Sequence, residues 1–229
     1  MTNNSKQSLL AFFKFFSKAF FIIFLIFLAS LVLNTFLESS KLEKTLLSPG
    51  LEENILDAEK LILGDGSNHS IGADDAQIVI VEFADFSCPY CKASFQKIRE
   101  ISTLYNDKVK YIWRDLPIVH DYSLDLALAA RCAGEQGLFW QMHDKLFIKQ
   151  GVKEKQEIYT LAKQVGVDME KFGSCFDSKK YIPKIQQDFD DAQKLGVHNL
   201  GTPIWFINGQ VIKGTISDED FDTIINHLK

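Results

Sequence analysis

The stretch IVIVEFADFSCPYC, residues 78–91, decides the fold that the sequence predicts. Residues 78–83 are apolar except for one glutamate, which is typical of a strand buried on both faces. Two cysteines follow, with two residues between them. Proline is favoured in the first turn of a helix, so Pro89 predicts a helix from there to about Leu104, with Cys88 as its N-cap.

The position of the two cysteines indicates redox chemistry. A thiolate at Cys88 would face unpaired backbone N–H groups and the positive end of the helix dipole. Both lower the pKa of a cysteine from about 8.5 toward roughly 3.5–7.5, and the thiolate is the attacking species in disulfide exchange. Cys91 lies one helical turn further on, where it can close a disulfide. We therefore expect Cys88 to be the nucleophile and Cys91 its partner.

Metal binding is the main alternative for this cysteine pair. A structural zinc site usually adds a second cysteine pair or two histidines. Cys132 and Cys175 lie 43 residues apart in expected helices, and His120 and His143 lack ligand spacing. We expect no metal and no other cofactor, although a carrier of Cu(I) stays open because two thiolates suit that ion.

The remaining pattern predicts an α/β fold in the order β-α-β, a helical block, then β-β-α. Residues 109–113 indicate a second strand, and residues 123–195 are helical in pattern almost throughout. Asn208-Gly209 is a hairpin turn, and Ser217 with Asp220 forms a capping box for a last helix to about Leu228. The hairpin strands are expected at residues 204–207 and 210–213.

The N-terminal segment has the composition of a membrane anchor. Residues 19–37 carry no charge, and 19 residues at about 1.5 Å each nearly cross a hydrocarbon core. No small-x-small cleavage site follows, so we expect an uncleaved signal-anchor, with a cleaved signal peptide as the alternative. Lys6, Lys14 and Lys18 should keep residues 1–18 cytoplasmic, which sends the C-terminal domain across the membrane.

Residues 38–72 are interpreted as a stalk. Four apolar residues recur there at helical spacing and indicate a short amphipathic helix: Leu51, Ile55, Ala58 and Ile62. Its apolar face could pack on the domain or on a second copy. The folded domain is expected at residues 73–229, with a helical insertion at about 120–196. The chain has a formal net charge of −5, which argues against nucleic acid as a partner.

Several motifs resemble those of the DsbA-like thioredoxin-fold proteins, over about residues 70–229. The resemblance implies a thioredoxin fold with an inserted helical domain. It also implies that the protein exchanges disulfides in exported proteins of the bacterial periplasm. The matching motifs are EFADFSCPYC at 82–91, AARCAGEQG at 129–137, FWQMHD at 139–144 and GTPIWFING at 201–209.

Three further positions take their expected roles from this resemblance. Thr202 and Pro203 resemble the family's cis-proline pair, which lies against the reactive cysteine and receives the substrate; the alternative is a proline that starts a strand. Glu82 resembles a buried acid that relays a proton to and from Cys91. The alternative for Glu82 is a structural acid paired with a lysine.

The dipeptide between the cysteines, Pro89-Tyr90, departs from the best-known oxidase, which has histidine in place of Tyr90. Tyrosine adds no positive charge, which favours a less oxidising protein. Thr202 is more similar to isomerase and reductase members. We expect an oxidase that forms disulfides, with an isomerase or reductase as the alternative, or a non-catalytic Cu(I) or redox partner of a membrane enzyme. A quinone-linked oxidase of DsbB or VKOR type, or a reductase, would recycle the pair.

Cys132 and Cys175 are expected to form a second, structural disulfide. Both lie in the helical block, beyond the predicted membrane span, and disulfides persist outside the cytoplasm. The competing interpretation is two reduced thiols in the core, because free cysteine is often buried.

Overall fold

The computed structural model describes residues 30–35 and 49–226 of the chain. Residues Asp57–Lys229 form one compact unit. Of the preceding unit, the structure describes residues 30–35, which are helical, and the beginning of α2 (Pro49–Leu63). Within the two described ranges, no helix is both long enough and apolar enough to cross a membrane. The predicted signal-anchor at residues 19–37 lies outside the described residues except for 30–35.

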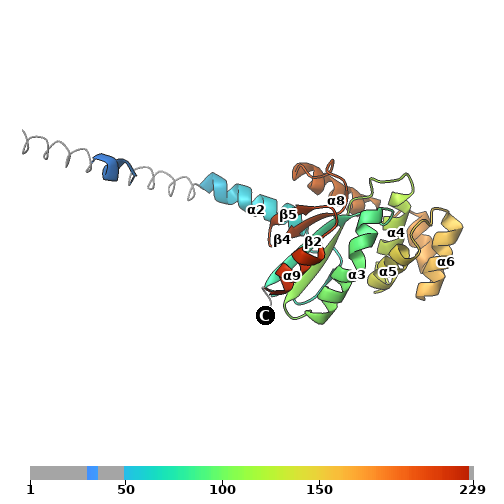
Figure 1. The fold of residues 1–229 in the computed structure, drawn as a ribbon. Coiled ribbons are helices and arrows are strands. Elements are labelled where there is room, and N and C mark those ends of the chain that lie inside the picture. Colours follow the sequence, from blue (N-terminus) through green and yellow to red (C-terminus); the bar gives the residue numbers. More distant parts are fainter. Residues whose placement is uncertain (1–29, 36–48, 227–229) are drawn as a thin grey trace, which may run out of the picture. The chain divides into compact units, whose positions relative to one another are not determined.

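A five-stranded sheet forms the centre of the folded unit, in the order β1-β3-β2-β4-β5 (Figure 1). The central strand β2 is parallel to β3 and antiparallel to β4, and six of its seven residues are buried. This explains its continuous apolar run. The strands are β1 (Ser70–Ile71), β2 (Ile78–Ala84), β3 (Val109–Asp115), β4 (Ile204–Ile207) and β5 (Gln210–Lys213).

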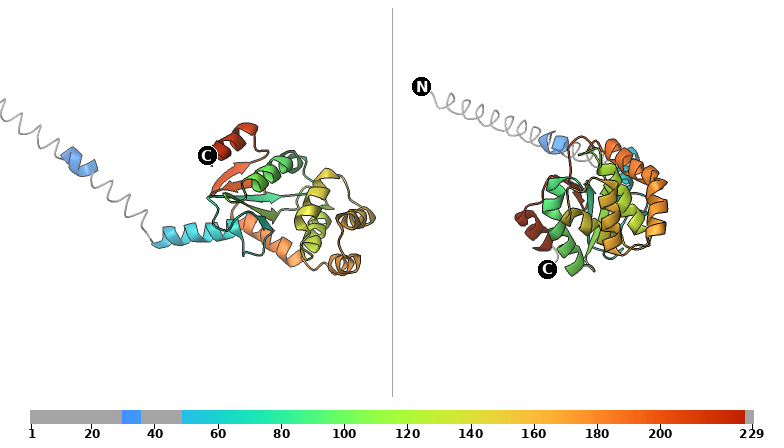
Figure 2. Two further views of the ribbon diagram at one scale, coloured as in Figure 1. Left: turned by 90° about the horizontal axis from the view of Figure 1, so that it is seen from below. Right: turned by 90° about the vertical axis from the view of Figure 1, so that its right-hand side faces the viewer.

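Helices cover both faces of the sheet and form a separate group beside it. In Figure 2, left, α3 and α9 lie on one face and α8 on the other, while α4 to α7 gather at the side of the sheet. The chain enters α4 after β3 and returns from α8 to β4, so the helices α4 to α8 lie between two strands of the sheet in the sequence. Their bounds are α3 (Pro89–Leu104), α4 (Ser123–Gly134), α5 (Phe139–Ile148), α6 (Lys155–Val165), α7 (Met169–Asp177), α8 (Ile182–Lys194) and α9 (Asp218–Asn226).

The sheet begins earlier in the chain than residue 73, the start that the sequence suggests for the domain. The edge strand β1 pairs with β3 from within the segment interpreted as a stalk. Arg114 of β3 also donates hydrogen bonds to the carbonyls of Leu61 and Ile62, at the end of α2, at 2.7 and 2.9 Å. A strand of two residues has too few positions for a periodic pattern, which is why β1 was missed.

A buried network of ion pairs joins the helical group to the sheet. Asp188 of α8 accepts hydrogen bonds from Arg114 of β3 at 2.9 Å and from Arg131 of α4 at 2.6 Å. Arg131 also pairs with Asp115, and Arg114 with Asp191 at 2.6 Å. Because each buried charge has opposite charges around it, the network avoids the cost of several kcal/mol that an unpaired buried ion carries.

An aromatic cluster packs beneath the start of α3. The ring of Phe147 from α5 lies 5.2 Å from Phe86 and 5.1 Å from Phe95, measured between centroids. Phe86 in turn stacks on Trp113 of β3 at 4.6 Å. Aromatic pairs at these separations add to the free energy of burial. The cluster therefore fixes the C-terminal end of α5 close to the turn between β2 and α3.

Candidate active site

Cys88 caps the helix that follows the central strand. It is the N-cap residue of α3, with φ −77° and ψ 123°, and Pro89 occupies the first helical position. Its backbone N–H donates to the carbonyl of Asp85 at 3.0 Å. The Asp85 carboxylate accepts hydrogen bonds from the backbone N–H groups of Ser87 and Val119, both at 2.8 Å. Hydrogen bonds to Asp85 therefore fix the turn between β2 and α3 and join it to the loop before α4.

The two thiols of this turn differ in acidity. Cys88 and Cys91 are free and buried. A hydrogen bond from the Cys91 thiol, together with donors including the backbone N–H groups of Cys91 and Tyr90, lowers the pKa of Cys88 to about 6. Burial, the hydrogen bond to Cys88 and the nearby Glu82 carboxylate raise the pKa of Cys91 well above its ordinary value. At neutral pH, Cys88 is a thiolate and Cys91 a thiol.

Thr202 lies against Cys88 and is joined to Pro203 by a cis peptide bond. In its protonated form, the Cys88 thiol donates to the Thr202 carbonyl at 3.2 Å. The Thr202 hydroxyl is buried and has no hydrogen-bond partner among the described residues. It is therefore free to donate to the Cys88 thiolate, and the Thr202 side chain contributes to the low pKa of Cys88.

Glu82 is a buried residue of β2, and its carboxyl group forms a hydrogen bond with a tyrosine of β3. The Tyr111 hydroxyl of β3 donates a hydrogen bond to one carboxylate oxygen of Glu82, and the other oxygen has no partner in the described part of the chain. Burial raises the pKa of Glu82 to about 8, against the lowering effect of Tyr111. Glu82 is thus mainly protonated at pH 7, and the negative charge that it gains at higher pH raises the pKa of Cys91.

A groove opens beside Cys88. It is lined by the start of α3, the loop before α4, the segment before Pro203 and the end of β5. Three large apolar residues in its lining are exposed to solvent, with exposed fractions of 63% for Tyr90, 37% for Val119 and 42% for Leu200. Lys213 adds one cation to the lining. Cys88 thus lies in the wall of a groove whose exposed side chains are largely apolar.

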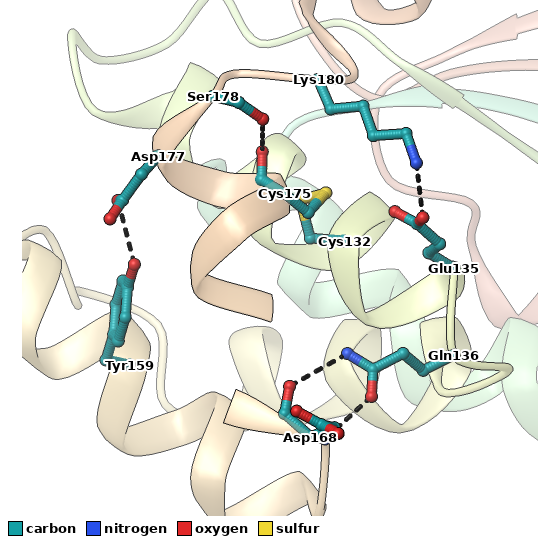
Figure 3. The surroundings of a disulfide bond; sticks show 9 residues. All are labelled: Cys132, Glu135, Gln136, Tyr159, Asp168, Cys175, Asp177, Ser178 and Lys180. Atoms are coloured by element: carbon teal, nitrogen blue, oxygen red, sulfur yellow. Dashed lines mark hydrogen bonds and ion pairs between the residues drawn. A yellow bond between two sulfur atoms is a disulfide. The ribbon is translucent and has the colours of Figure 1, made fainter. Parts of the chain in front are cut away.

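Cys132 and Cys175 are joined by a disulfide between α4 and α7, with their Cα atoms 5.7 Å apart (Figure 3). Both cysteines are buried. The surrounding side chains pair with one another: Lys180 with Glu135, and Tyr159 with Asp177 at 2.9 Å. The bond thus lies in the helical group, in surroundings separate from those of the Cys88 turn.

Two residues of the site were not identified from the sequence. Tyr111 lies in a buried strand, where a hydroxyl needs a partner, but the sequence does not say which one. Gln150 follows α5 and donates hydrogen bonds to the carbonyls of Phe86 and Cys88 at 3.0 and 2.8 Å. A glutamine after a helix carries no signal of such a contact.

Comparisons with known proteins identify the family and the fold of this chain. The profile of the Thioredoxin family matches residues 65–227. A Na⁺/H⁺ antiporter NhaA of Salinispora tropica is 36% identical over 163 residues, which cover 70% of this chain and 24% of the antiporter. The chain spans about a quarter of the length of the curated relatives it matches, so the match concerns only a part of those proteins.

Two solved structures have a fold similar to that of this chain. The catalytic domain of ScsC from Proteus mirabilis is 25% identical, with a TM-score of 0.65, over 76% of this chain and 96% of that domain. The thiol-disulfide exchange protein alpha-DsbA2 from Wolbachia pipientis is 23% identical, with a TM-score of 0.64, over 80% of this chain and all of that one. The chain therefore belongs to the thioredoxin family, and its fold is that of the DsbA-like members, as its motifs predict.

Proposed function

We propose that this chain is a thiol-disulfide oxidoreductase that forms disulfides in exported proteins through Cys88 and Cys91. The observation that supports this direction is the N-cap position of Cys88 on α3, where the backbone N–H groups of Tyr90 and Cys91 help to lower the pKa of its thiol to about 6. A stabilised Cys88 thiolate favours the reduced form of the pair, and a dithiol whose reduced form is stabilised makes a stronger oxidant. The pair would then pass its disulfide to a substrate rather than keep it.

The proposed reaction moves two electrons from substrate to protein. A substrate thiolate attacks the sulfur of Cys88 in the Cys88–Cys91 disulfide, and Cys91 leaves as a thiolate that takes a proton. A second substrate thiolate attacks the substrate sulfur of the mixed disulfide and releases the Cys88 thiolate. The substrate chain would lie in the groove lined by Pro89, Tyr90 and Thr202, and would meet Pro203 next to Thr202. A membrane redox partner would reoxidise the pair.

The direction of transfer is tested by mixing the oxidised full-length chain with a reduced, unfolded protein that has two cysteines. We expect one substrate disulfide to form for each Cys88–Cys91 pair reduced. If the reduced chain instead opens insulin disulfides and the oxidised chain leaves the substrate reduced, the protein is a reductase. Anaerobic titration with Cu(I) covers the remaining alternative, because a metal carrier would bind the ion tightly and exchange no disulfides.

Replacing Glu82 by glutamine tests the proposed proton relay. Glu82 has a pKa of about 8, raised from 4.5, so at pH 7 it carries the proton that the leaving Cys91 needs. We expect Glu82→Gln to slow reduction of the Cys88–Cys91 disulfide by a small thiol roughly 10- to 100-fold at pH 7. Stopped-flow measurement of that step, corrected for the thiolate fraction of the reagent, gives the rate.

The pH profile of this step separates the relay from a structural role. As the pH rises through about 8, wild-type Glu82 loses its proton, so the corrected rate should fall. The glutamine variant cannot titrate and should show no inflection there. Glu100, an exposed acid on α3, provides the control, and Glu100→Gln should keep the wild-type profile. An inflection that persists in Glu82→Gln would leave Glu82 with a structural role only.

We also propose that residues 19–37 anchor the domain to the bacterial inner membrane, and that the chain between this segment and the folded unit is the connection to it. The support is the uncharged apolar run and the three lysines that precede it in a segment without acidic residues. In the native host, the full-length protein should sediment with membranes, resist extraction by high salt and be released by detergent. A shorter soluble form that begins near residue 35 would show that the segment is cleaved.

A further inference from the structure

Gln150 makes a direct polar contact between the helical group and the turn that carries the active-site cysteines. Its side-chain Nε2 donates to the carbonyl of Phe86 at 3.0 Å and to the carbonyl of Cys88 at 2.8 Å. A carboxamide nitrogen has two hydrogens, one for each carbonyl. Gln150 therefore binds the backbone on both sides of Ser87, immediately before α3.

The Cys88 carbonyl is an effective place to hold this turn. The peptide group between Cys88 and Pro89 has no N–H, because proline lacks one, so only its carbonyl can form a hydrogen bond. That carbonyl accepts from the backbone N–H of Lys92 at 3.1 Å and from Gln150. Loss of Gln150 would leave this peptide group with the helical hydrogen bond alone among the described residues.

The orientation of this peptide group affects the thiolate. Rotation about ψ of Cys88 turns its carbonyl and, with it, the direction of α3 relative to the sulfur. At the observed ψ of 123°, the backbone N–H groups of Tyr90 and Cys91 stabilise the thiolate. A turn that is free to rotate would present these donors to the sulfur for less of the time.

The position of Gln150 is itself fixed from the helical group. Its backbone N–H donates to the carbonyl of Phe147 at 3.2 Å. The Phe147 ring packs on Phe86, whose carbonyl accepts a hydrogen bond from Gln150, and on Phe95 of α3. The carboxamide thus comes from a rigid end of α5 and spans the boundary between the insertion and the sheet.

We propose that Gln150 is a positioning residue for disulfide exchange, by which the helical insertion holds the Cys88 peptide group so that the thiolate faces the N-terminal N–H groups of α3. The inference rests on the proposed role of Cys88 as nucleophile. It gives the insertion a part in setting the reactivity of the cysteine pair, through one side chain and two carbonyls.

The test replaces Gln150 by methionine, which keeps the length of the side chain and removes both donors. The matched control is Gln136→Met. Gln136 is half-buried like Gln150 and also forms two hydrogen bonds with one stretch of backbone, to the carbonyl and from the N–H of Asp168, at 3.2 and 2.8 Å (Figure 3). Its partner belongs to the helical group, so both variants lose two hydrogen bonds but only one loses them at the Cys88 turn.

The readout is the pKa of Cys88 in the reduced full-length chain, from the ultraviolet absorbance of the thiolate and from the pH dependence of its alkylation. A turn that presents its N–H donors to the sulfur for less of the time lowers the acid dissociation constant of Cys88, by about 3- to 10-fold for a pKa rise of half a unit to one unit. We therefore expect Gln150→Met to raise the pKa of Cys88 by about half a unit to one unit, and Gln136→Met to leave it unchanged. Gln150→Asn, whose shorter stem cannot reach both carbonyls, should shift it in the same direction and serves if the methionine variant does not fold.

An unchanged pKa of Cys88 in a folded Gln150 variant would overturn the inference, as would an equal rise in Gln136→Met. Failure of the proposed function gives a different result. In that case wild-type Cys88 itself would titrate like an ordinary thiol, or Cys91 would be alkylated first, before any variant is compared.

Discussion

Replacement of Cys88 by serine should reduce the rate of thiol–disulfide exchange by about 10³-fold or more. The hydroxyl of serine stays protonated at neutral pH, whereas the pKa of Cys88 is lowered to about 6, so the wild-type sulfur is an attacking thiolate and a good leaving group. Turnover of a peptide disulfide, followed by fluorescence, measures the loss.

Cys91→Ser is the matched control for this variant. It should also stop turnover, because no second thiol resolves the mixed disulfide, but Cys88 should still react with a disulfide reagent and remain bound to it. Alkylation of the reduced wild-type chain should modify Cys88 before Cys91. A Cys88→Ser variant that retains activity through Cys91 would reverse the assignment of roles.

Removal of the second disulfide should destabilise the fold without changing the chemistry at Cys88. Cys132 and Cys175 are 43 residues apart, and in the chain-entropy model a crosslink over such a loop stabilises by about 4 kcal/mol. We expect the double variant Cys132→Ala/Cys175→Ala to lose about this much free energy of unfolding, measured by urea denaturation with the Cys88–Cys91 pair reduced. Both cysteines are replaced together so that no free thiol remains to pair with Cys88.

The pKa of Cys88 provides the second half of this test. The groups that lower it, the Cys91 thiol and donors from Tyr90 and Thr202, all lie outside the surroundings of the second disulfide. It should therefore remain near 6 in the double variant, as long as the protein is folded. An unfolding free energy equal to that of the wild type would mean that the bond contributes little to stability.

The sequence predicts the parts of the structure that depend on local pattern. The buried run of β2, the N-cap position of Cys88 and the capping box at Ser217 each depend on residues within a few positions of one another, and each is present. Ser217 and Asp220 exchange the expected hydrogen bonds, with the Ser217 hydroxyl 2.7 Å from the Asp220 carboxylate.

Contacts between distant residues could not be predicted in this way. The hydrogen bond between Glu82 and Tyr111 depends on the register of two parallel strands, and the pairing of Arg114 with Asp188 on how α8 packs against β3. The alternative interpretation of Glu82 as a structural acid predicts a lysine as its partner, whereas the structure has Tyr111. Sequence periodicity gives the buried face of each element but not the neighbour that meets it.

The equilibrium of the full-length chain with reduced and oxidised glutathione tests the central claim most directly. Mass spectrometry of trapped samples follows each cysteine. We predict that the Cys88–Cys91 disulfide opens and closes reversibly, that glutathione attaches to Cys88 in the Cys91→Ser variant, and that Cys132–Cys175 stays closed over the same range. Glutathione on Cys91 with Cys88 unmodified, or no exchange at this pair at all, would contradict the account.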